Sequence, residues 1–153
     1  MQGVLRIGVI SDTHDHLPGF VVSELKAAGL DEIWHLGDVT AEHILDDLHI
    51  LDVPIHVVRG NCDFNYEWPL IIDLKRHGIR FRLQHIPPNR HHLPENTDIL
   101  LHGHTHVPRD ETVHGIRFLN PGTIGKPNKG APPSFAFLTI GANGEVGWEI
   151  RKI

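Results

Sequence analysis

The pattern of hydrophobic and polar residues divides the chain into two halves of different character. In the first sixty residues, three largely apolar runs predict strands: Val4–Ile10, Glu32–Leu36 and Ile55–Val58. Between them, apolar residues at helical spacing predict one helix that begins near Pro18 and ends at Gly29, and a second that Thr40 caps and that ends before Pro54. The order strand, helix, strand, helix, strand predicts a parallel sheet with right-handed crossovers.

The second half of the chain is rich in short strands separated by turn signals. Three pairs of runs flank such signals: Leu70–Leu74 with Ile79–Leu83, Thr112–Val113 with Ile116–Leu119, and Ser134–Ile140 with Glu145–Ile150. Asp98–Leu101 adds a strand without a hairpin partner. We therefore expect a mostly antiparallel second half and, for residues 1–153 together, a single domain with a mixed α/β sandwich.

Composition narrows the class of protein. The formal net charge of −5 disfavours stable binding to a nucleic-acid backbone, and there is no run of about 18 apolar residues that predicts a membrane span. The first ten residues lack the pattern of a secretory signal. The single cysteine cannot form an internal disulfide, which favours a reducing, cytoplasmic location.

Histidine is unusually frequent, with 14 residues in the chain. At this frequency random placement produces about one His-x-His pair, so such a pair alone predicts nothing. The position of the histidines along the predicted strands is more informative than their number.

Five predicted strands each lead into a side chain that can bind a metal ion. These candidates are Asp12, His14, Asp38, Asn61, His85, His104 and His106. Ligand sites in open α/β sheets lie beyond the carboxyl ends of strands, so we expect these side chains to meet. On extended backbone, residues two apart face the same side about 6–7 Å apart, which would pair the side chains of Asp-x-His and His-x-His. Mixed nitrogen and oxygen ligands favour Mn, Fe, Co, Ni or Zn over Ca or Mg.

The order of these motifs resembles that of a known family. Asp12-Thr13-His14, Gly37-Asp38, Gly60-Asn61-Cys62-Asp63, a lone His85, Gly103-His104-Thr105-His106 and the later Asn120-Pro121-Gly122-Thr123 are similar to the motifs of calcineurin-like metallophosphoesterases, in particular the small prokaryotic phosphodiesterases. The resemblance implies a four-layer α-β-β-α sandwich of two mixed β-sheets flanked by helices. It also implies a phosphodiesterase with two metal ions that hydrolyses small or activated phosphodiesters through a metal-bridging hydroxide.

The resemblance also implies a role for each ligand. One metal ion would be held by Asp12, His14 and His106, and the other by Asn61, His85 and His104, with Asp38 bridging the two. Two divalent ions per chain are expected, with Mn preferred and Ni, Co, Fe or Zn as alternatives. The residues implied in catalysis are Asp38, Asn61, Cys62 and His104.

The sequence departs from the family pattern at two positions. Cys62 occupies the position where many relatives have a histidine, and a thiol is a poorer proton donor than an imidazolium near neutral pH. This departure favours a diester over a monoester as substrate. Ile86 follows His85 where the family usually has a glycine. In the loop beyond it, Arg90 and His92 either border the substrate or belong to a solvated surface.

A second function on the same fold is a protein-binding scaffold, as in a retromer subunit that resembles this family. The complete set of seven ligands favours catalysis over that alternative. The partners expected on the catalytic hypothesis are a small phosphodiester and, possible for this family, further copies of the chain. No membrane association is expected.

Overall fold

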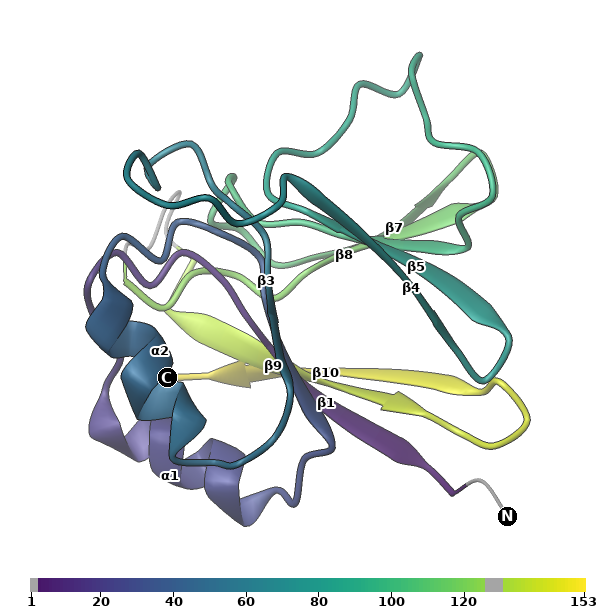
Figure 1. Ribbon diagram of the computed structural model, residues 1–153. Helices are drawn as coiled ribbons and strands as arrows, with labels where there is room; N and C mark the ends of the chain where they lie inside the picture. Colours follow the sequence, from purple (N-terminus) through teal and green to yellow (C-terminus); the bar gives the residue numbers. More distant parts are fainter. Residues whose placement is uncertain (1–2, 126–130) are drawn as a thin grey trace.

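The computed structural model describes residues 3–125 and 131–153, which form two five-stranded sheets and two helices (Figure 1). The first sheet contains, in spatial order, β10 (Val146–Lys152), β9 (Ser134–Ile140), β1 (Leu5–Ile10), β2 (Glu32–His35) and β3 (Ile55–Val57). The second contains β4 (Ile71–Arg76), β5 (Ile79–Gln84), β6 (Ile99–Leu101), β8 (Ile116–Asn120) and β7 (Arg109–Val113). The helices are α1 (Gly19–Ala27) and α2 (Glu42–His49).

The first half of the chain forms the predicted parallel unit. β1 pairs in parallel with β2, and β2 with β3, while α1 and α2 make the two connections. The predicted hairpin of β9 and β10 then joins antiparallel to the other side of β1. The carboxyl ends of β1, β2 and β3 therefore lie at the same edge of the first sheet.

The second sheet is mixed, although most strand pairings in the second half of the chain are antiparallel, as predicted. The hairpins β4–β5 and β7–β8 are antiparallel as predicted, but β6 pairs in parallel with both β5 and β8. Parallel pairing requires a long crossover, and residues 85–98 between β5 and β6 provide one. The direction of β6 was not encoded in its own short apolar run.

The main core lies between the two sheets, and a second core lies under the helices. Leu101 and Leu119 of the second sheet pack against Trp34 of the first. On the other face of the first sheet, both helices bury their apolar side chains: Val21, Leu25, Ile44 and Leu48. This confirms the predicted α/β sandwich of two mixed sheets.

The outer face of the second sheet is covered differently from that of the first. Leu100 and Phe118 point to this face and pack against Leu93, which belongs to the segment between β5 and β6. In the described residues this segment is a loop, so the fourth layer of the sandwich is a loop where we expected helices.

The predicted N-cap of the second helix was wrong by one position. Ala41 is the N-cap residue of α2, and Thr40 lies in the left-handed region with a φ of 65°. The Thr40 hydroxyl donates to the Asp15 carboxylate, and its backbone N–H donates to Asp63 Oδ1 at 2.8 Å. Thr40 therefore joins the loops after β1, β2 and β3 instead of capping the helix.

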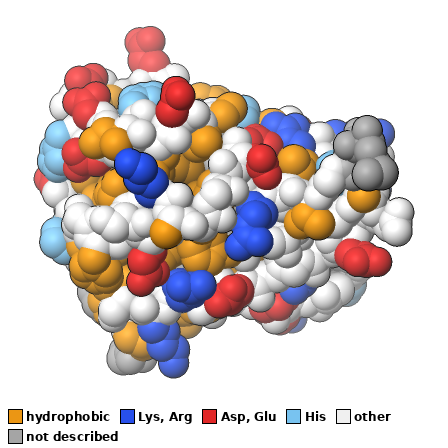
Figure 2. Space-filling model, turned by 90° about the horizontal axis from the view of Figure 1, so that it is seen from below, with side chains coloured by type: hydrophobic (Ala, Val, Ile, Leu, Met, Phe, Trp, Pro, Cys, Tyr) orange, Lys and Arg blue, Asp and Glu red, His pale blue; other side chains and the backbone are white. Residues whose placement is uncertain are grey.

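Across residues 3–125 and 131–153 no helix combines the length and the apolar character required to cross a bilayer. Figure 2 shows one face of the molecule, on which acidic and basic side chains are interspersed among hydrophobic ones.

Candidate metal centre

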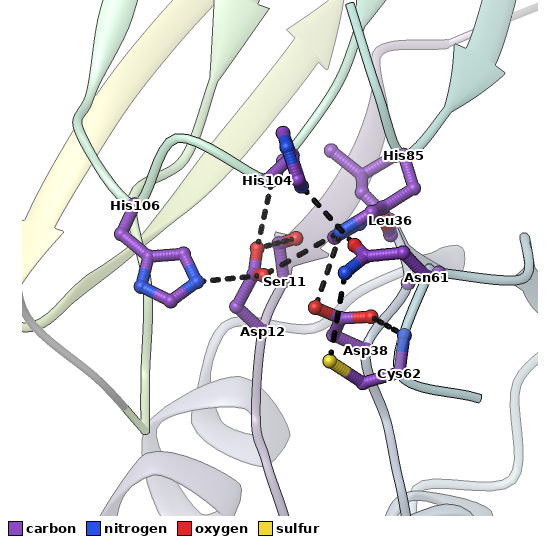
Figure 3. A network of polar contacts seen from close by, with 12 residues as sticks. Ser11, Asp12, Leu36, Asp38, Asn61, Cys62, His85, His104 and His106 are labelled. Carbon is purple, nitrogen blue, oxygen red and sulfur yellow. Dashed lines mark hydrogen bonds and ion pairs between the residues drawn. The ribbon is translucent and has the colours of Figure 1, made fainter. Parts of the chain in front are cut away.

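The loops that follow five strands converge between the two sheets and bring the seven predicted ligands together. Figure 3 labels all of them except His14. β1 leads to Asp12 and His14, β2 to Asp38 and β3 to Asn61. The second sheet contributes His85 after β5, and His104 and His106 after β6. The site therefore lies where the carboxyl ends of strands from both sheets face each other.

Four of the seven side chains form a compact group. One donor atom from each of Asp12, His14, Asp38 and His106 lies within 4.8 Å of the others. His106 Nε2 is 3.0 Å from Asp12 Oδ1, and His14 Nε2 is 3.6 Å from both Asp12 Oδ1 and Asp38 Oδ2. This spacing matches the set expected to hold the first metal ion together with the bridging carboxylate.

The other three side chains adjoin this group, and His85 Nε2 is 3.8 Å from Asp12 Oδ1. His85 Nε2 is 3.2 Å from Asp38 Oδ2, and the rings of His85 and His104 have centroids 5.2 Å apart. His104 Nδ1 is in turn 3.1 Å from Asn61 Oδ1. Asp38 thus contacts a histidine of each group, which is the position that a bridging ligand requires.

The candidate ligands differ in solvent exposure: those on one side of the site are buried and those on the other are exposed. Asp12 is 0% exposed, and Asp38 and His85 are each 2% exposed, whereas Asn61 and His104 are exposed to solvent. A ligand from solution therefore reaches the site on the side of Asn61 and His104.

Two buried nitrogen atoms show that the residues present fit metal ions. Among the described residues, His14 Nε2 and His85 Nε2 are buried without a hydrogen-bond partner. The His85 Nδ1–H donates to the Leu36 carbonyl at 2.7 Å, so Nε2 is the nitrogen left to bind another group. A buried polar atom without a partner is costly, and a cation between these nitrogens and the two carboxylates would satisfy both kinds of donor atom.

The electrostatics of the site favour positive charge at its centre. Burial raises the pKa of Asp12, but its contacts with His106 and His14 outweigh this effect and hold the pKa below its usual range. Burial also raises the pKa of Asp38, but contacts with His85 and with the Cys62 N–H outweigh burial, so the pKa of Asp38 is lowered overall. Burial lowers the pKa of His85, yet Asp38 and Asp12 raise it above its ordinary value. Because both carboxylates stay ionised, protons and metal ions compete for the same nitrogens.

The backbone of most candidate ligands lies in the left-handed region, contrary to our expectation of extended backbone. The φ angles of Asp12, His14, Asp38, His104 and His106 are 54°, 45°, 56°, 71° and 64°. Residues other than glycine rarely adopt this region, and its cost is accepted mainly at functional sites. The side chains of each Asp-x-His and His-x-His pair therefore meet through tight turns after the strands and not through the pleat of a strand.

Hydrogen bonds from neighbouring loops hold this strained backbone in place. The Asp63 carboxylate accepts the N–H groups of Asp38 and Gly60, at 2.9 and 2.7 Å, so it positions the backbone of a candidate ligand and not a ligand side chain. Ser11 donates its hydroxyl to Asp12 Oδ2 at 2.5 Å, and Thr123 donates to the Asp12 carbonyl at 3.0 Å. Ser11 was not among the predicted site residues, although a hydroxyl beside a candidate ligand at a strand end was a usable signal.

His35 and His102 lie beside the site but point away from its centre. His35 Nδ1 accepts the Gly37 N–H and its Nε2 is 3.1 Å from the Thr13 hydroxyl. Complete burial lowers the pKa of His35 to about 3. Burial also lowers the pKa of His102, to about 4, while Arg109 donates to its Nε2 at 3.1 Å. Both are neutral histidines that hold loops together.

Cys62 lies at the open side of the site, next to both Asn61 and Asp38. Its backbone N–H donates to Asp38 Oδ1 at 2.8 Å, and the Asn61 amide donates to its Sγ at 3.6 Å. Arg90 and His92, in contrast, are exposed on the loop outside the second sheet. Their placement favours a solvated surface over a border of the substrate site.

Comparison with known proteins gives consistent similarities. A model of the calcineurin-like phosphoesterase superfamily domain matches residues 5–143. A probable metallophosphoesterase of Methanocaldococcus jannaschii is 35% identical over 142 residues, covering 80% of this chain and 70% of its own. The phosphodiesterase YfcE of Escherichia coli strain K12 is 27% identical over 161 residues, covering 88% of each chain.

A solved structure shows the same fold. Wild-type Vps29 from Entamoeba histolytica, in complex with Zn²⁺, superimposes with a TM-score of 0.74 and covers 97% of this chain and 99% of its own. Its sequence identity of 22% shows likeness of fold alone.

Proposed function

The chain belongs to the calcineurin-like phosphoesterase superfamily, and on that premise we propose that it is a phosphodiesterase that uses two divalent metal ions. Its substrates are small or activated phosphodiesters, and Mn is the preferred ion, with Ni, Co, Fe or Zn as alternatives. The proposal includes a cytoplasmic location, which rests on the single cysteine, and allows a homo-oligomer, which rests on the family resemblance alone.

The observation that carries the proposal is a pair of buried nitrogens in the described residues, His14 Nε2 and His85 Nε2, which have no hydrogen-bond partner and both lie near Asp38 Oδ2. Asp12, His14 and His106 would hold one ion, and Asn61, His85 and His104 the other. Asp38 contacts both groups and would bridge the two ions.

The chain's own residues position the substrate and balance its charge. Bound at the site, two divalent cations would neutralise phosphoryl charge and lower the pKa of a water so that it can attack phosphorus. The exposed side chains of Asn61 and His104 lie where a phosphoryl group enters from solution. The buried carboxylates of Asp12 and Asp38 are already in position before the substrate binds, so little reorganisation of charged groups is needed during the reaction.

Cys62 supports a diester as the substrate. It lies beside Asn61 at the open side of the site, where a group could protonate a leaving oxygen. A thiol does so less well than an imidazolium near neutral pH. A monoester carries two negative charges and a poor leaving group needs a proton, so a diester with an aryl leaving group is the better substrate.

Hydrolysis of bis(p-nitrophenyl) phosphate and of p-nitrophenyl phosphate, each with Mn, Ni, Co, Zn and Mg, tests the proposal. The chelated protein should be inactive, added metal should restore activity, and the diester should be hydrolysed with the larger kcat/KM. Elemental analysis should find two ions per chain. A metal-loaded protein that hydrolyses neither ester would contradict the proposal.

A protein-binding scaffold is the alternative function, and the fold shared with Vps29 is the observation in its favour. The two functions differ in whether bound metal ions support ester hydrolysis. A scaffold would keep its fold and bind a protein partner without turnover in the presence of any of these metals. The esterase assay above therefore distinguishes the two.

A further inference from the structure

Large hydrophobic side chains are exposed around one cavity next to the metal centre. The cavity has a volume of about 490 Å³ and includes Asn61 and His85 in its wall. Four exposed hydrophobic residues line it: Phe64, Leu70, Ile71 and Ile86, which are 87%, 58%, 46% and 51% exposed. Exposed hydrophobic groups that gather at a cavity mark a binding site more often than scattered ones do.

The positions of these residues explain why they face the cavity. Leu70 and Ile71 lie at the start of β4, an edge strand of the second sheet, and Ile71 is paired with Gln84 of β5. Ile86 follows His85 directly, and Phe64 follows Asn61 by three residues in the same loop, between β3 and β4. The apolar wall is thus built from the same two segments that place Asn61 and His85.

Arg59 adds a positive charge to the wall of this cavity. Six other arginines are paired with carboxylates: Arg76, Arg80, Arg82, Arg109, Arg117 and Arg151. Among the described residues, the Arg59 guanidinium has no carboxylate within ion-pair distance. A guanidinium that is not paired within the protein is available to an anion.

We propose that this cavity binds an aromatic substituent of the phosphodiester while the phosphoryl group lies at the metal centre. The inference rests on the proposed function and makes the substrate class narrower. The cavity is continuous with Asn61 and His85, Arg59 attracts the single negative charge of a diester, and Phe64 and Ile86 supply the apolar contact. Ile86, which replaces the usual glycine of the family, is a specificity-determining residue.

The direct test compares two monoanions that contain no ester bond. Calorimetry on the Mn-loaded protein measures the Kd of methylphenylphosphinate and of dimethylphosphinate. The phenyl compound should bind about tenfold more tightly, because burying a ring adds apolar contact that a methyl group cannot make. Phe64→Ala and Ile86→Gly should each reduce this ratio several-fold. Because both side chains are more than half exposed, neither change removes core packing.

Two further variants separate apolar contact from charge. Arg59→Gln should weaken the binding of both phosphinates by a similar factor and leave the ratio of their Kd values unchanged. Phe20→Ala removes another exposed phenylalanine, which is 53% exposed and lies on α1, and should alter neither the two Kd values nor their ratio. If Phe64→Ala and Ile86→Gly leave the ratio at its wild-type value, the cavity does not bind the substituent and the proposal is wrong.

Kinetics on a matched pair of diesters keeps this inference distinct from the proposed function. Phenyl p-nitrophenyl phosphate and methyl p-nitrophenyl phosphate release the same leaving group. If neither diester is hydrolysed in a metal-dependent way, the proposed phosphodiesterase function is wrong. If the diesters are hydrolysed but Phe64→Ala and Ile86→Gly leave the ratio of the two phosphinate Kd values unchanged, only the proposed role of the cavity is wrong. Sedimentation tests a third outcome, in which this surface is an interface between copies of the chain. In that case Phe64→Ala would convert an oligomer to a monomer, and the ratio of the two phosphinate Kd values would stay constant.

Discussion

The Asp63 carboxylate accepts the backbone N–H of Asp38 at 2.9 Å, and this contact fixes the proposed bridging ligand from behind. The same carboxylate accepts the N–H groups of Gly60 and Thr40, so one buried side chain joins the loops after β2 and β3. Asp63 is 2% exposed and is not itself near enough to act as a ligand of the four-residue group. It is a positioning residue for the metal centre.

Asp63→Asn should weaken metal binding without removing a ligand. The amide replaces one carboxylate oxygen by an N–H group, which opposes a backbone N–H and disturbs the loop that carries Asp38. Loss of comparable supporting contacts costs about 10–100-fold in metal affinity. Isothermal titration with Mn measures the effect, and Asp52→Asn, at an exposed carboxylate beyond α2, is the matched control. Equal affinities in both variants would remove this role from Asp63.

Asp38→Asn should have a stronger effect because it removes the charge shared by the two ions. We expect loss of at least one metal ion and of most diesterase activity. Elemental analysis of the purified variant gives the stoichiometry, and kcat/KM for bis(p-nitrophenyl) phosphate gives the activity. Two bound ions with wild-type turnover would contradict the assignment of Asp38 as the bridge.

Gly60→Ala should displace Asp38 by steric contact. A Cβ added to Gly60 would lie 2.2 Å from both the N and Oδ1 atoms of Asp38. Because a backbone atom is one of the two, the loop must shift, and we expect about 1–3 kcal/mol of destabilisation with weaker metal binding. Gly19→Ala, where an added Cβ meets nothing within 4 Å, should be neutral or slightly stabilising in the same urea titration.

The position of the candidate ligands after strand ends could be predicted from the sequence because it follows from local signals. Strand-end positions can be found from short apolar runs, and the carboxyl ends of adjacent parallel strands must meet at one edge of a sheet. Asp12, Asp38 and Asn61 follow β1, β2 and β3 and were found in this way. Whether each binds a metal ion stays a prediction that the variants above test.

The features that the sequence did not predict depend on contacts between distant segments. The parallel pairing of β6 with β5 and β8 is decided by the course of residues 85–98, which no short run records. The left-handed backbone of His104 is stabilised by its N–H contact with Asp12, 92 residues away. The apolar cavity likewise exists only because Phe64 and Ile86 come together in space.

Glu32→Gln should lower stability more at neutral pH than in acid. Burial raises the pKa of Glu32, but hydrogen bonds from Arg76 and Trp34 outweigh this and lower it. The folded-state pKa therefore lies below the unfolded one, so the carboxylate stabilises the fold above the unfolded pKa of about 4.5 and loses this effect as the pH falls. Arg76 Nε lies 2.8 Å from Glu32 Oε2. We therefore expect Glu32→Gln to lower the free energy of unfolding by about 2 kcal/mol near neutral pH.

Urea unfolding of the chelated protein near neutral pH and at about pH 4 measures this difference. Glu145→Gln, at an exposed position in the turn before β10, is the control and should show little change at either pH. A Glu32→Gln variant whose destabilisation is the same at both values would show that the ionised form of Glu32 is not the stabilising one.

Cys62→His should shift the enzyme toward monoesters. Cys62 contacts Asn61 through its Sγ and Asp38 through its N–H, so a histidine here would lie beside the phosphoryl position and titrate near neutral pH. Protonation of a leaving oxygen is worth about 10²–10⁴-fold in rate, of which a side chain not already positioned would recover only part. The monoester gains more than the diester, because its leaving group depends more on a proton.

The ratio of kcat/KM for p-nitrophenyl phosphate and bis(p-nitrophenyl) phosphate, measured in wild type and Cys62→His, tests this expectation. Cys62→Ser separates loss of the thiol from gain of the imidazole, since serine supplies neither a thiol nor a group that titrates near neutrality. The ratio should rise in the histidine variant alone, with two metal ions still bound. A ratio that stays flat or falls while the metal content is unchanged would mean that position 62 does not reach the leaving group, and the preference for diesters would then need another cause.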